Sequence, residues 1–391
     1  MRVLIVHNDY VSANPSGERR VVTDDQANLR AAGVDVVSYI RSSDEIPTLS
    51  RQRKAELLIR PAYSREDSQA LAALLRRERP DIMHLHNPYP LISPHVVRVA
   101  HAAGVPVVQT VHNYRMTCVN GAFFRDGKVC TDCVGLRVPL PALKHGCYRD
   151  SRAQSAVMTG TLAVHRPTWR SVERFLPVTP FMAAHLREAG IPAERITPKP
   201  NTVPDPGAPS PPGTGLLFAG RLVEEKGIRL LLEGWERSGG GSLGRLVIVG
   251  DGPLRDEVER AAGAGIGITY LGPVPAERVD ELMREAAVVA VPSLWFEGFP
   301  MTVLEAYARA RPVVATAIGS VGTVVDDEVG WRSGSTPDEL ADVLRAVTPE
   351  QVAARGTAGR ARYEAEFAPK IVTEKLIGIY GDVIEQYKRR G

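Results

Sequence analysis

Short apolar runs alternate with amphipathic stretches in the first half of the chain. The apolar runs predict strands at Arg2–His7, Val34–Ile40, Ile82–His86 and Pro106–Val111, and the amphipathic stretches predict helices such as Glu18–Ala32 and Ser68–Arg79. Buried strands that alternate with helices are typical of βαβ units and of a parallel sheet. We therefore expect an α/β domain in this half.

A segment dense in proline and glycine, Pro198–Gly213, follows this region. Proline removes backbone donors and fixes φ, so the segment is predicted to be a linker. From Gly215 the alternation returns, with predicted elements at Leu216–Ala219, Gly227–Arg237, Leu246–Val249, Leu254–Ala262, Ile268–Leu271, Val279–Glu285, Val288–Val291, Val303–Ala310 and Pro312–Ala315. A last helical pattern covers Ile371–Arg389. We expect two parallel-sheet α/β domains that face each other across a cleft.

Length and composition agree with this organisation. A chain of 391 residues is long enough for two domains with separate cores. The net charge of +3 is too small to indicate nucleic-acid binding, and no patch of basic and aromatic residues adds to it. The opening MRVLIVHNDY is expected to be a buried strand rather than a signal peptide, and no apolar run is long enough to span a membrane.

These observations predict a cytoplasmic protein. Contact with the inner face of a membrane is a further expectation, through Arg51, Arg53, Lys54 and Arg60. The alternative for these residues is a solvated helix face.

The most informative chemical pattern is WFEGFPMTVLEAYA, which places Glu297 and Glu305 eight residues apart. Glu297 is predicted to lie in a loop and Glu305 one turn into a helix, so that their carboxylates could hold ligand hydroxyls on either side of a diphosphate bound at the N-terminus of that helix. The intervening Gly298, Phe299, Pro300 and Met301 would approach the ligand with their backbone groups, although Pro300 has no N–H.

Each glutamate also has an interpretation without a ligand. Thr302-x-x-Glu305 fits a helix capping box, in which Glu305 would only close the first turn. Glu297 could be a solvated carboxylate in a loop.

Two cations follow a predicted strand in the sequence GRLVEEKG at 220–227. Arg221 and Lys226 could stabilise the negative charge that a pyrophosphate gains as it leaves. The alternative is a surface pair at a helix start. Further along, GDGP at 250–253 is a tight turn whose role is either structural or ligand-binding.

With these motifs in this order, the chain resembles the retaining glycosyltransferases of family 4, which have the GT-B fold. The resemblance rests on the glutamate pair, GRLVEEKG, GDGP and the first strand with its glycine loop, and it covers nearly the whole chain. It implies an acceptor-binding domain at 1–200, a donor-binding domain at 201–370, and a helix at 371–391 that crosses back to the first domain.

The resemblance also implies roles for the residues of the second domain. Arg221 and Lys226 would bind the donor diphosphate, and Glu305 would contact the ribose hydroxyls. Glu297 would contact the transferred sugar and act as a catalytic residue.

In the first domain the family usually has a glycine pair after the first strand. Here Ser16 replaces the first glycine, so only Gly17 is expected to contact the donor. His112, in VHNYR, is expected beside the transferred sugar as a second catalytic residue, and a core histidine is the alternative. His84 and His86 share one face of a strand, but without a third ligand they do not indicate a metal site.

The predicted reaction is transfer of a hexose-type sugar, with retention, from a UDP- or GDP-sugar to an acceptor hydroxyl. The acceptor would be a polysaccharide, a lipid-linked intermediate of the cell envelope, or a natural product. No Asp-x-Asp occurs in the chain, so no catalytic metal is expected. The alternatives are other enzymes of the same fold, such as a nucleotide-sugar epimerase or a phosphorylase. A nicotinamide dehydrogenase would need G-x-G-x-x-G after a strand, and this chain lacks it.

The four cysteines lie close together in the sequence, at Cys118, Cys130, Cys133 and Cys147. A Cys-x-x-Cys flanked by single cysteines resembles a structural zinc site. The alternatives are free buried thiols, and a redox pair or disulfide. A hairpin with Asp126-Gly127 at its turn is predicted between the first two cysteines.

Overall fold

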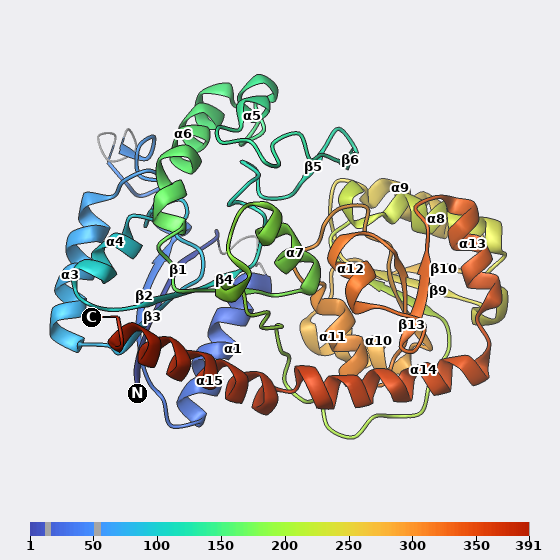
Figure 1. Ribbon diagram of the computed structural model, residues 1–391. Helices are drawn as coiled ribbons and strands as arrows, with labels where there is room; N and C mark the ends of the chain where they lie inside the picture. Colours follow the sequence, from blue (N-terminus) through green and yellow to red (C-terminus); the bar gives the residue numbers. More distant parts are fainter. Residues whose placement is uncertain (12–16, 51–55, 391) are drawn as a thin grey trace. The chain divides into compact units, whose positions relative to one another are not determined.

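The computed structural model describes residues 1–11, 17–50 and 56–390, and their contacts divide the chain into two units. Unit 1 comprises Met1–Phe123, Thr131–Asn201 and the C-terminal residues from Lys370 onward. Unit 2 comprises Phe124–Cys130 and Thr202–Pro369. Figure 1 shows that each unit is built around its own sheet.

Unit 1 contains a parallel sheet of five strands in the order β2-β1-β3-β4-β7. These strands are β1 (Arg2–Asp9), β2 (Asp35–Ser42), β3 (Ile82–Leu85), β4 (Val107–Val111) and β7 (Arg174–Pro177). The accompanying helices are α1 (Gly17–Ala31), α3 (Arg65–Glu78), α4 (Val96–Ala102), α5 (Leu140–His145), α6 (Arg152–Trp169), α7 (Pro180–Glu188) and α15 (Pro369–Lys388).

Two helices from opposite ends of the chain cover one face of this sheet. Leu29 of α1 and Val383 of α15 belong to the same buried core as Ile5 of β1, and the two helices lie near each other in Figure 1. The hydroxyl of Tyr380, on α15, lies 2.5 Å from Nδ1 of His84 on β3. The last helix therefore completes the core of unit 1, because burial of strands on both faces is what stabilises a parallel sheet.

Unit 2 contains a six-stranded parallel sheet in the order β10-β9-β8-β11-β12-β13. Its strands are β8 (Leu216–Ala219), β9 (Leu246–Val249), β10 (Ile268–Tyr270), β11 (Val288–Val291), β12 (Val313–Thr316) and β13 (Gly330–Ser333). Its helices are α8 (Ile228–Ser238), α9 (Arg255–Gly263), α10 (Ala276–Glu285), α11 (Met301–Ala308), α12 (Gly319–Val324), α13 (Pro337–Ala346) and α14 (Pro349–Arg362).

Successive side chains of each central strand in unit 2 enter different cores. Leu216 and Phe218 pack with Trp235 of α8 on one face, whereas Leu217 packs with Tyr307 of α11 on the other. The period of two follows from strand geometry. The prediction of two parallel-sheet α/β domains, the GT-B class, is confirmed.

The segment predicted to be a linker is anchored at its start. Lys199 is fully buried, and its Nζ lies 2.6 Å from Oδ2 of Asp25 on α1. The hydroxyl of Thr202 donates to the carbonyl of Phe367, at 2.6 Å. The prediction of a plain linker over Pro198–Gly213 was therefore wrong for its first residues, because a lysine in a proline-rich context gives no sign that it will be buried with a carboxylate.

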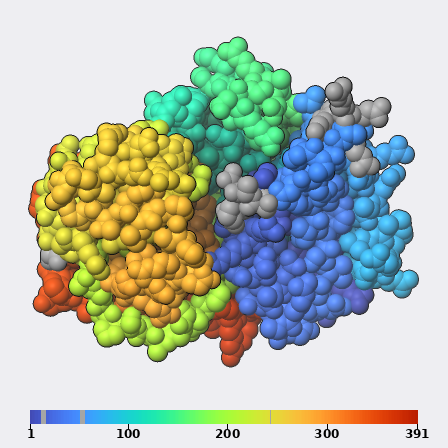
Figure 2. All heavy atoms as spheres, turned by 180° about the vertical axis from the view of Figure 1, so that it is seen from behind, coloured from blue at the N-terminus to red at the C-terminus, as the bar shows by residue number. Residues whose placement is uncertain are grey.

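The region with the cysteines contains the predicted hairpin. Strands β5 (Phe124–Arg125) and β6 (Lys128–Val129) pair antiparallel. Asp126 and Gly127 have φ of 53° and 74°, as a two-residue hairpin turn requires. Helices α5 and α6, drawn in green, lie at the surface of unit 1 (Figure 2).

Of the basic residues predicted to contact a membrane, Arg60 is the one that lies in the described part of the chain. Arg51, Arg53 and Lys54 lie outside the described residues. Arg60 is only 3% exposed and is paired with Glu66, so the expectation that it reaches a membrane or solvent was wrong. In the described parts of the chain, no helix combines the length and apolar character needed to cross a bilayer.

Candidate functional site

In unit 2 the two sequence motifs meet at the point where strand order reverses. The chain runs from β8 to β9 on one side of β8, whereas β11 pairs with β8 on the other side. The segment 220–227 follows β8, and the segment 292–300 follows β11. Both segments leave the carboxyl ends of adjacent parallel strands, where ligands bind in open α/β sheets.

Lys226 and Glu297 form an ion pair at this point. Nζ of Lys226 lies 2.6 Å from Oε1 of Glu297, which also accepts a hydrogen bond from the hydroxyl of Ser293 at 2.7 Å. Glu297 is 5% exposed, so it is not the solvated loop carboxylate that the sequence left open. The amide of Leu294 donates to the carbonyl of Glu225 at 2.9 Å and fixes the two segments together.

Gly227 makes this approach sterically feasible. Its φ is 71°, and a Cβ added there would lie 1.8 Å from the carbonyl oxygen of Pro292. A larger residue would therefore separate the backbone after β8 from the backbone after β11. Since Lys226 directly precedes Gly227, the glycine positions the ammonium beside Glu297.

The electrostatics of the pair keep Glu297 ionised. Burial by itself raises the pKa of the Glu297 carboxyl. The Lys226 ammonium and the hydrogen bonds from Lys226 and Ser293 lower the pKa by more than burial raises it, so the pKa lies below its ordinary value. The site therefore contains a carboxylate that stays charged although it is removed from water.

Arg221 differs from Lys226 in its surroundings. Its side chain is 63% exposed and makes an ion pair of 3.4 Å with Glu225. An exposed pair of this kind is held weakly. The guanidinium can therefore rearrange toward an anionic ligand, whereas the Lys226 ammonium is already fixed.

Helix α11 begins two residues earlier than the capping-box interpretation of Glu305 requires. Its N-cap is Pro300, no side chain caps it, and Met301 is its first residue. Thr302 therefore lies inside the helix, so the capping box of Thr302 and Glu305 does not form. Glu305 lies in the second turn, half-buried, and its role as a ribose ligand stays a prediction.

The loop before α11 is partly fixed by packing. The Phe299 ring meets the Phe367 ring edge to face, with centroids 6.1 Å apart. The backbone of Phe299, with that of Gly298, Pro300 and Met301, leads directly into the N-terminus of α11. Amides at such a terminus attract anions.

The GDGP turn is a structural partner of the 220–227 segment. A Cβ on Gly250 would lie 1.8 Å from the carbonyl oxygen of Gly220. The amide of Leu222 donates to the carbonyl of Asp251 at 2.9 Å. Of the two roles considered for this turn, the structure provides evidence for the structural one.

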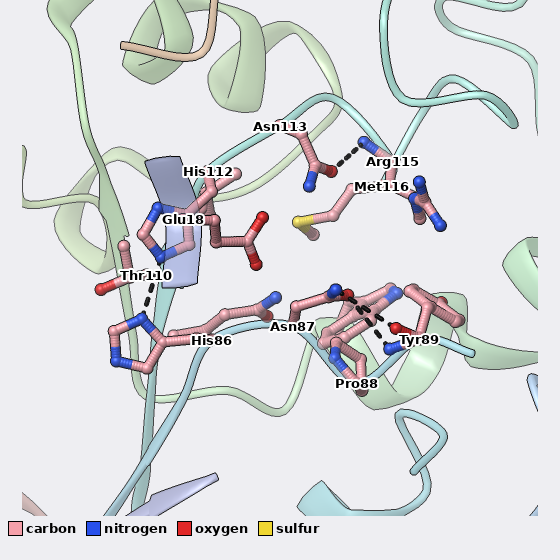
Figure 3. A pocket seen from close by; sticks show the side chains of 13 residues that line it. Glu18, His86, Asn87, Pro88, Tyr89, Thr110, His112, Asn113, Arg115 and Met116 are labelled. Carbon is pink, nitrogen blue, oxygen red and sulfur yellow. Dashed lines mark hydrogen bonds between the residues drawn. The ribbon is translucent and has the colours of Figure 1, made fainter. Parts of the chain in front are cut away.

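Unit 1 has a hollow of about 320 Å³ at the carboxyl ends of its central strands (Figure 3). Strand order reverses here too, since β1 lies between β2 and β3. The hollow is lined by Glu18, His86, Asn87, Pro88, Tyr89, Gln109, Thr110, Val111, His112, Asn113, Arg115, Met116 and Trp169. His112 thus lines a pocket and is partly exposed, and its contact with a ligand stays a prediction.

His112 is held by a second histidine. Nε2 of His112 lies 2.9 Å from Nδ1 of His86, and the rings stack with centroids 5.2 Å apart. Burial, together with neighbouring His7 and Lys199, lowers the pKa of both rings well below the ordinary value, so both are neutral near pH 7.

The tautomer of this pair follows from hydrogen-bond accounting. Nε2 of His86 is buried without a partner. Buried N–H groups without hydrogen-bond partners are rarer than buried acceptor atoms without hydrogen-bond partners. We therefore assign the His86 proton to Nδ1, from which it is donated to His112, and this leaves the His112 proton on Nδ1.

Glu18 lines the same pocket and follows Gly17, the first residue of α1. Burial raises the pKa of its carboxyl, and the nearby His7 and Arg115 offset this only in part. His7 itself lies 3.0 Å from Oδ1 of Asp9. Residues 12–16, including Ser16, lie outside the described residues.

Sequence reasoning missed several of these residues. Glu18 and Arg115 were not expected to be functional, although Glu18 adjoins Gly17 and Arg115 ends the sequence VHNYR. Their positions after β1 and β4 were the available signal. Tyr89, which follows β3, had the same signal, whereas Trp169 at the end of α6 had none, because its approach depends on tertiary packing.

The structure does not group the four cysteines as ligands of a metal ion. None of the four described cysteines takes part in a disulfide. The Sγ of Cys118 donates to Oδ1 of Asn120 at 2.9 Å. Among the residues that the structure describes, no three His, Cys, Asp or Glu side chains are grouped as metal ligands. The structure therefore gives no support to the zinc prediction, which stays a prediction.

Two family models match the chain. Residues 16–202 match the glycosyl transferase 4-like domain, and residues 213–348 match glycosyl transferases group 1. A D-inositol 3-phosphate glycosyltransferase of Salinispora tropica is 33% identical over 159 residues, which is 37% of this chain and 32% of that relative. The chain matches about a third of the length of the first curated relatives.

Solved structures with the same fold cover the whole chain. Sucrose-phosphate synthase from Thermosynechococcus elongatus has a TM-score of 0.71 at 17% identity, over 98% of this chain and 99% of its own. Anabaena HepE, in complex with UDP and glucose, has a TM-score of 0.64 at 14% identity, over 98% of this chain and 100% of its own. The fold and the two matching domain models show that this chain belongs to the group 1 glycosyltransferases with a glycosyl transferase 4-like domain.

Proposed function

We propose that this protein is a retaining glycosyltransferase that moves a hexose-type sugar from a UDP- or GDP-sugar to an acceptor hydroxyl. The ion pair of Lys226 with Glu297 carries the proposal. It places a fixed cation and an ionised carboxylate at the switch point of the unit 2 sheet, beside the N-terminus of α11. HepE, which shares the fold, was solved with UDP and glucose.

In this proposal unit 2 binds the donor. Lys226, Arg221 and the α11 amides stabilise the diphosphate as the bond from sugar to phosphate breaks. Glu297 contacts the transferred sugar, and Glu305 contacts the ribose. These groups supply positive charge without a divalent ion, so donor binding is expected to be independent of metal.

Unit 1 binds the acceptor in the pocket with His112 and Glu18. The acceptor oxygen attacks on the face that the diphosphate leaves, and the departing phosphate oxygen takes the acceptor proton. The configuration at the sugar carbon is then retained, and no separate protein base is needed. Cytoplasmic location, and an acceptor that is a polysaccharide, a lipid-linked intermediate or a natural product, belong to the same proposal.

The test is a panel of UDP-, GDP- and dTDP-sugars, with thermal stabilisation and release of nucleoside diphosphate as readouts, with and without EDTA. A ligand that binds only the folded state raises the melting temperature. We expect one nucleotide series to stabilise the protein equally with and without EDTA. Glu305→Ala should weaken nucleotide binding, whereas Glu297→Ala should depress turnover more than binding.

The anomeric configuration of the product, read by proton NMR, tests retention. Inversion would contradict the mechanism, and a nucleotide-bound epimer without transfer would favour the epimerase alternative. Phosphate-dependent cleavage without a nucleotide would favour a phosphorylase. If no nucleotide stabilises the protein, the proposed function is wrong.

A further inference from the structure

The pocket in unit 1 concentrates polar atoms that have no partner. Within the described parts of the chain, fifteen buried side-chain nitrogen or oxygen atoms lack a hydrogen bond. Six of them belong to residues that line this pocket: Glu18, His86, Tyr89, Gln109, Arg115 and Trp169. Buried polar groups are nearly always hydrogen-bonded in folded proteins, so such a concentration indicates a ligand with complementary groups.

Arg115 is the most informative of the six because it carries a fixed charge. Its guanidinium lies over the rings of Tyr89 and Tyr148, 5.7 Å from each centroid. Among the described residues it forms no ion pair, and only its backbone amide is bonded, to Asn113 at 3.1 Å. Nε of this guanidinium is buried without a partner, and a buried donor of this kind is costly unless an acceptor, such as an anion, joins it.

The hydroxyl of Tyr89 adds a second unused donor at the same place. Tyr89 is 3% exposed, and its hydroxyl has no partner. Its ring already contacts the guanidinium of Arg115. A guanidinium and a phenol that border one hollow form a receptor for a phosphate or carboxylate oxygen.

The pocket has two chemically different ends. In Figure 3, Arg115 lies on one side of the view, and Glu18 and His112 lie on the other, with Met116 between them. Glu18 is not the counter-ion of Arg115, since no ion pair joins the two. One end therefore suits an anion, and the other suits a group that donates a hydrogen bond to a carboxylate.

We propose that this pocket selects an acceptor that carries an anionic group, a phosphate or a carboxylate, next to a hydroxyl-bearing ring. Arg115 binds the anion, and the Tyr89 hydroxyl donates to it. Glu18 accepts a hydrogen bond from an acceptor hydroxyl at the opposite end. The assignment rests on the proposed function, in which unit 1 binds the acceptor, and it makes Arg115 a specificity-determining residue.

The experiment is isothermal titration of the full chain with three matched probes: glucose, glucose 6-phosphate and glucuronate. We expect at least one anionic sugar to bind more tightly than glucose, and the stronger of the two identifies phosphate or carboxylate as the group. Arg115→Gln should weaken that probe roughly 10- to 100-fold, the effect of a lost charge-assisted hydrogen bond, and leave the affinity for glucose unchanged.

Further variants protect the result from a folding defect. Arg115→Lys keeps the charge and should keep part of the preference, and Tyr89→Phe removes only the hydroxyl and should weaken the anionic probe alone. Arg187→Gln, at an exposed arginine of α7 outside the pocket, is the matched control and should change nothing.

If neither anionic probe binds the wild-type chain better than glucose, the proposal is wrong. It is also wrong if folded Arg115→Gln retains the preference. UDP and GDP binding, measured on the same samples, separates the two levels. If the wild-type protein binds a nucleotide but does not prefer an anionic sugar, only this inference is wrong. If the wild-type protein binds neither UDP nor GDP, the proposed function is wrong.

Discussion

Each unit places a glutamate near the carboxyl edge of its sheet, and the two carboxyls have opposite electrostatics. Glu297 of unit 2 is paired with Lys226, and its pKa is lowered. Oε1 of Glu18 in unit 1 has no hydrogen-bond partner and only a long contact of 3.8 Å with Nδ1 of His7, and burial raises the pKa of the carboxyl. In unit 2 the charge of the glutamate is therefore balanced by a partner within the protein, whereas in unit 1 the glutamate lacks such a partner.

The difference shows how the two sites are specified. A cation paired with a carboxylate needs no ligand to balance its charge, so the pair stabilises the fold of its own unit. Its two residues can also be recognised from a sequence motif. A pocket of unpaired groups is complete only with its ligand, and such groups reduce stability until the ligand binds. Binding sites often break local stability rules in this way.

Removal of Lys226 should have the largest effect on this comparison. Lys226→Met leaves Glu297 buried without its partner, so the free energy of unfolding should fall by about 3 kcal/mol. Turnover should fall about 10²–10³-fold through loss of charge stabilisation. Urea unfolding and donor turnover measure the two effects.

The double variant Lys226→Met/Glu297→Gln should regain most of the stability without regaining activity. Arg221→Met is the stability control, because its exposed pair should contribute less than about 0.5 kcal/mol. Equal stability losses for Lys226→Met and Arg221→Met would show that the Lys226–Glu297 pair does not stabilise the protein more than an exposed ion pair does.

Glu18→Gln tests the pocket of unit 1, in which the glutamate lacks a charge partner. A raised pKa in the folded state means that the stabilising contribution is present below the unfolded value of about 4.5 and is lost as pH rises through the folded pKa. At neutral pH the variant should therefore unfold with a free energy equal to or above that of wild type. Transfer to the acceptor should fall roughly 10- to 100-fold. A stability loss like that of Lys226→Met would place Glu18 with the structural residues.

Acid pH tests the same contrast through the protonation of buried groups. The lowered pKa of His84, His86 and His112 means that their contribution is present above the unfolded value of about 6.5 and is lost as pH falls below it. Glu297 behaves in the same direction below about pH 4.5. Each group changes the free energy of unfolding by at most about 1.4 kcal/mol per pH unit.

Unfolding followed from pH 8 downward should show stability decline first near pH 6.5. His86→Gln should make that first decline shallower and leave the later one unchanged. A wild-type curve that is flat between neutral pH and 5 would contradict the buried, neutral histidines.

Much of the fold was predictable because its signals are local. The predicted bounds of Leu216–Ala219, Leu246–Val249 and Val288–Val291 coincide with β8, β9 and β11. These strands are continuous apolar runs between turn residues, and such runs have few alternatives. The burial of Lys199 had no such signal, because a charged residue is buried only when a distant partner, here Asp25, meets it.

Sequence by itself determined the two α/β units, the family motifs and the identity of the donor-site candidates Arg221, Lys226, Glu297 and Glu305. Only the tertiary structure showed that Lys226 pairs with Glu297, that α11 begins at Met301 without a side-chain cap, and that Arg115, Tyr89 and Glu18 line one pocket. Strands and turns follow from the order of neighbouring residues. Ion pairs and pockets depend on which loops the parallel strand order brings to the same edge of a sheet.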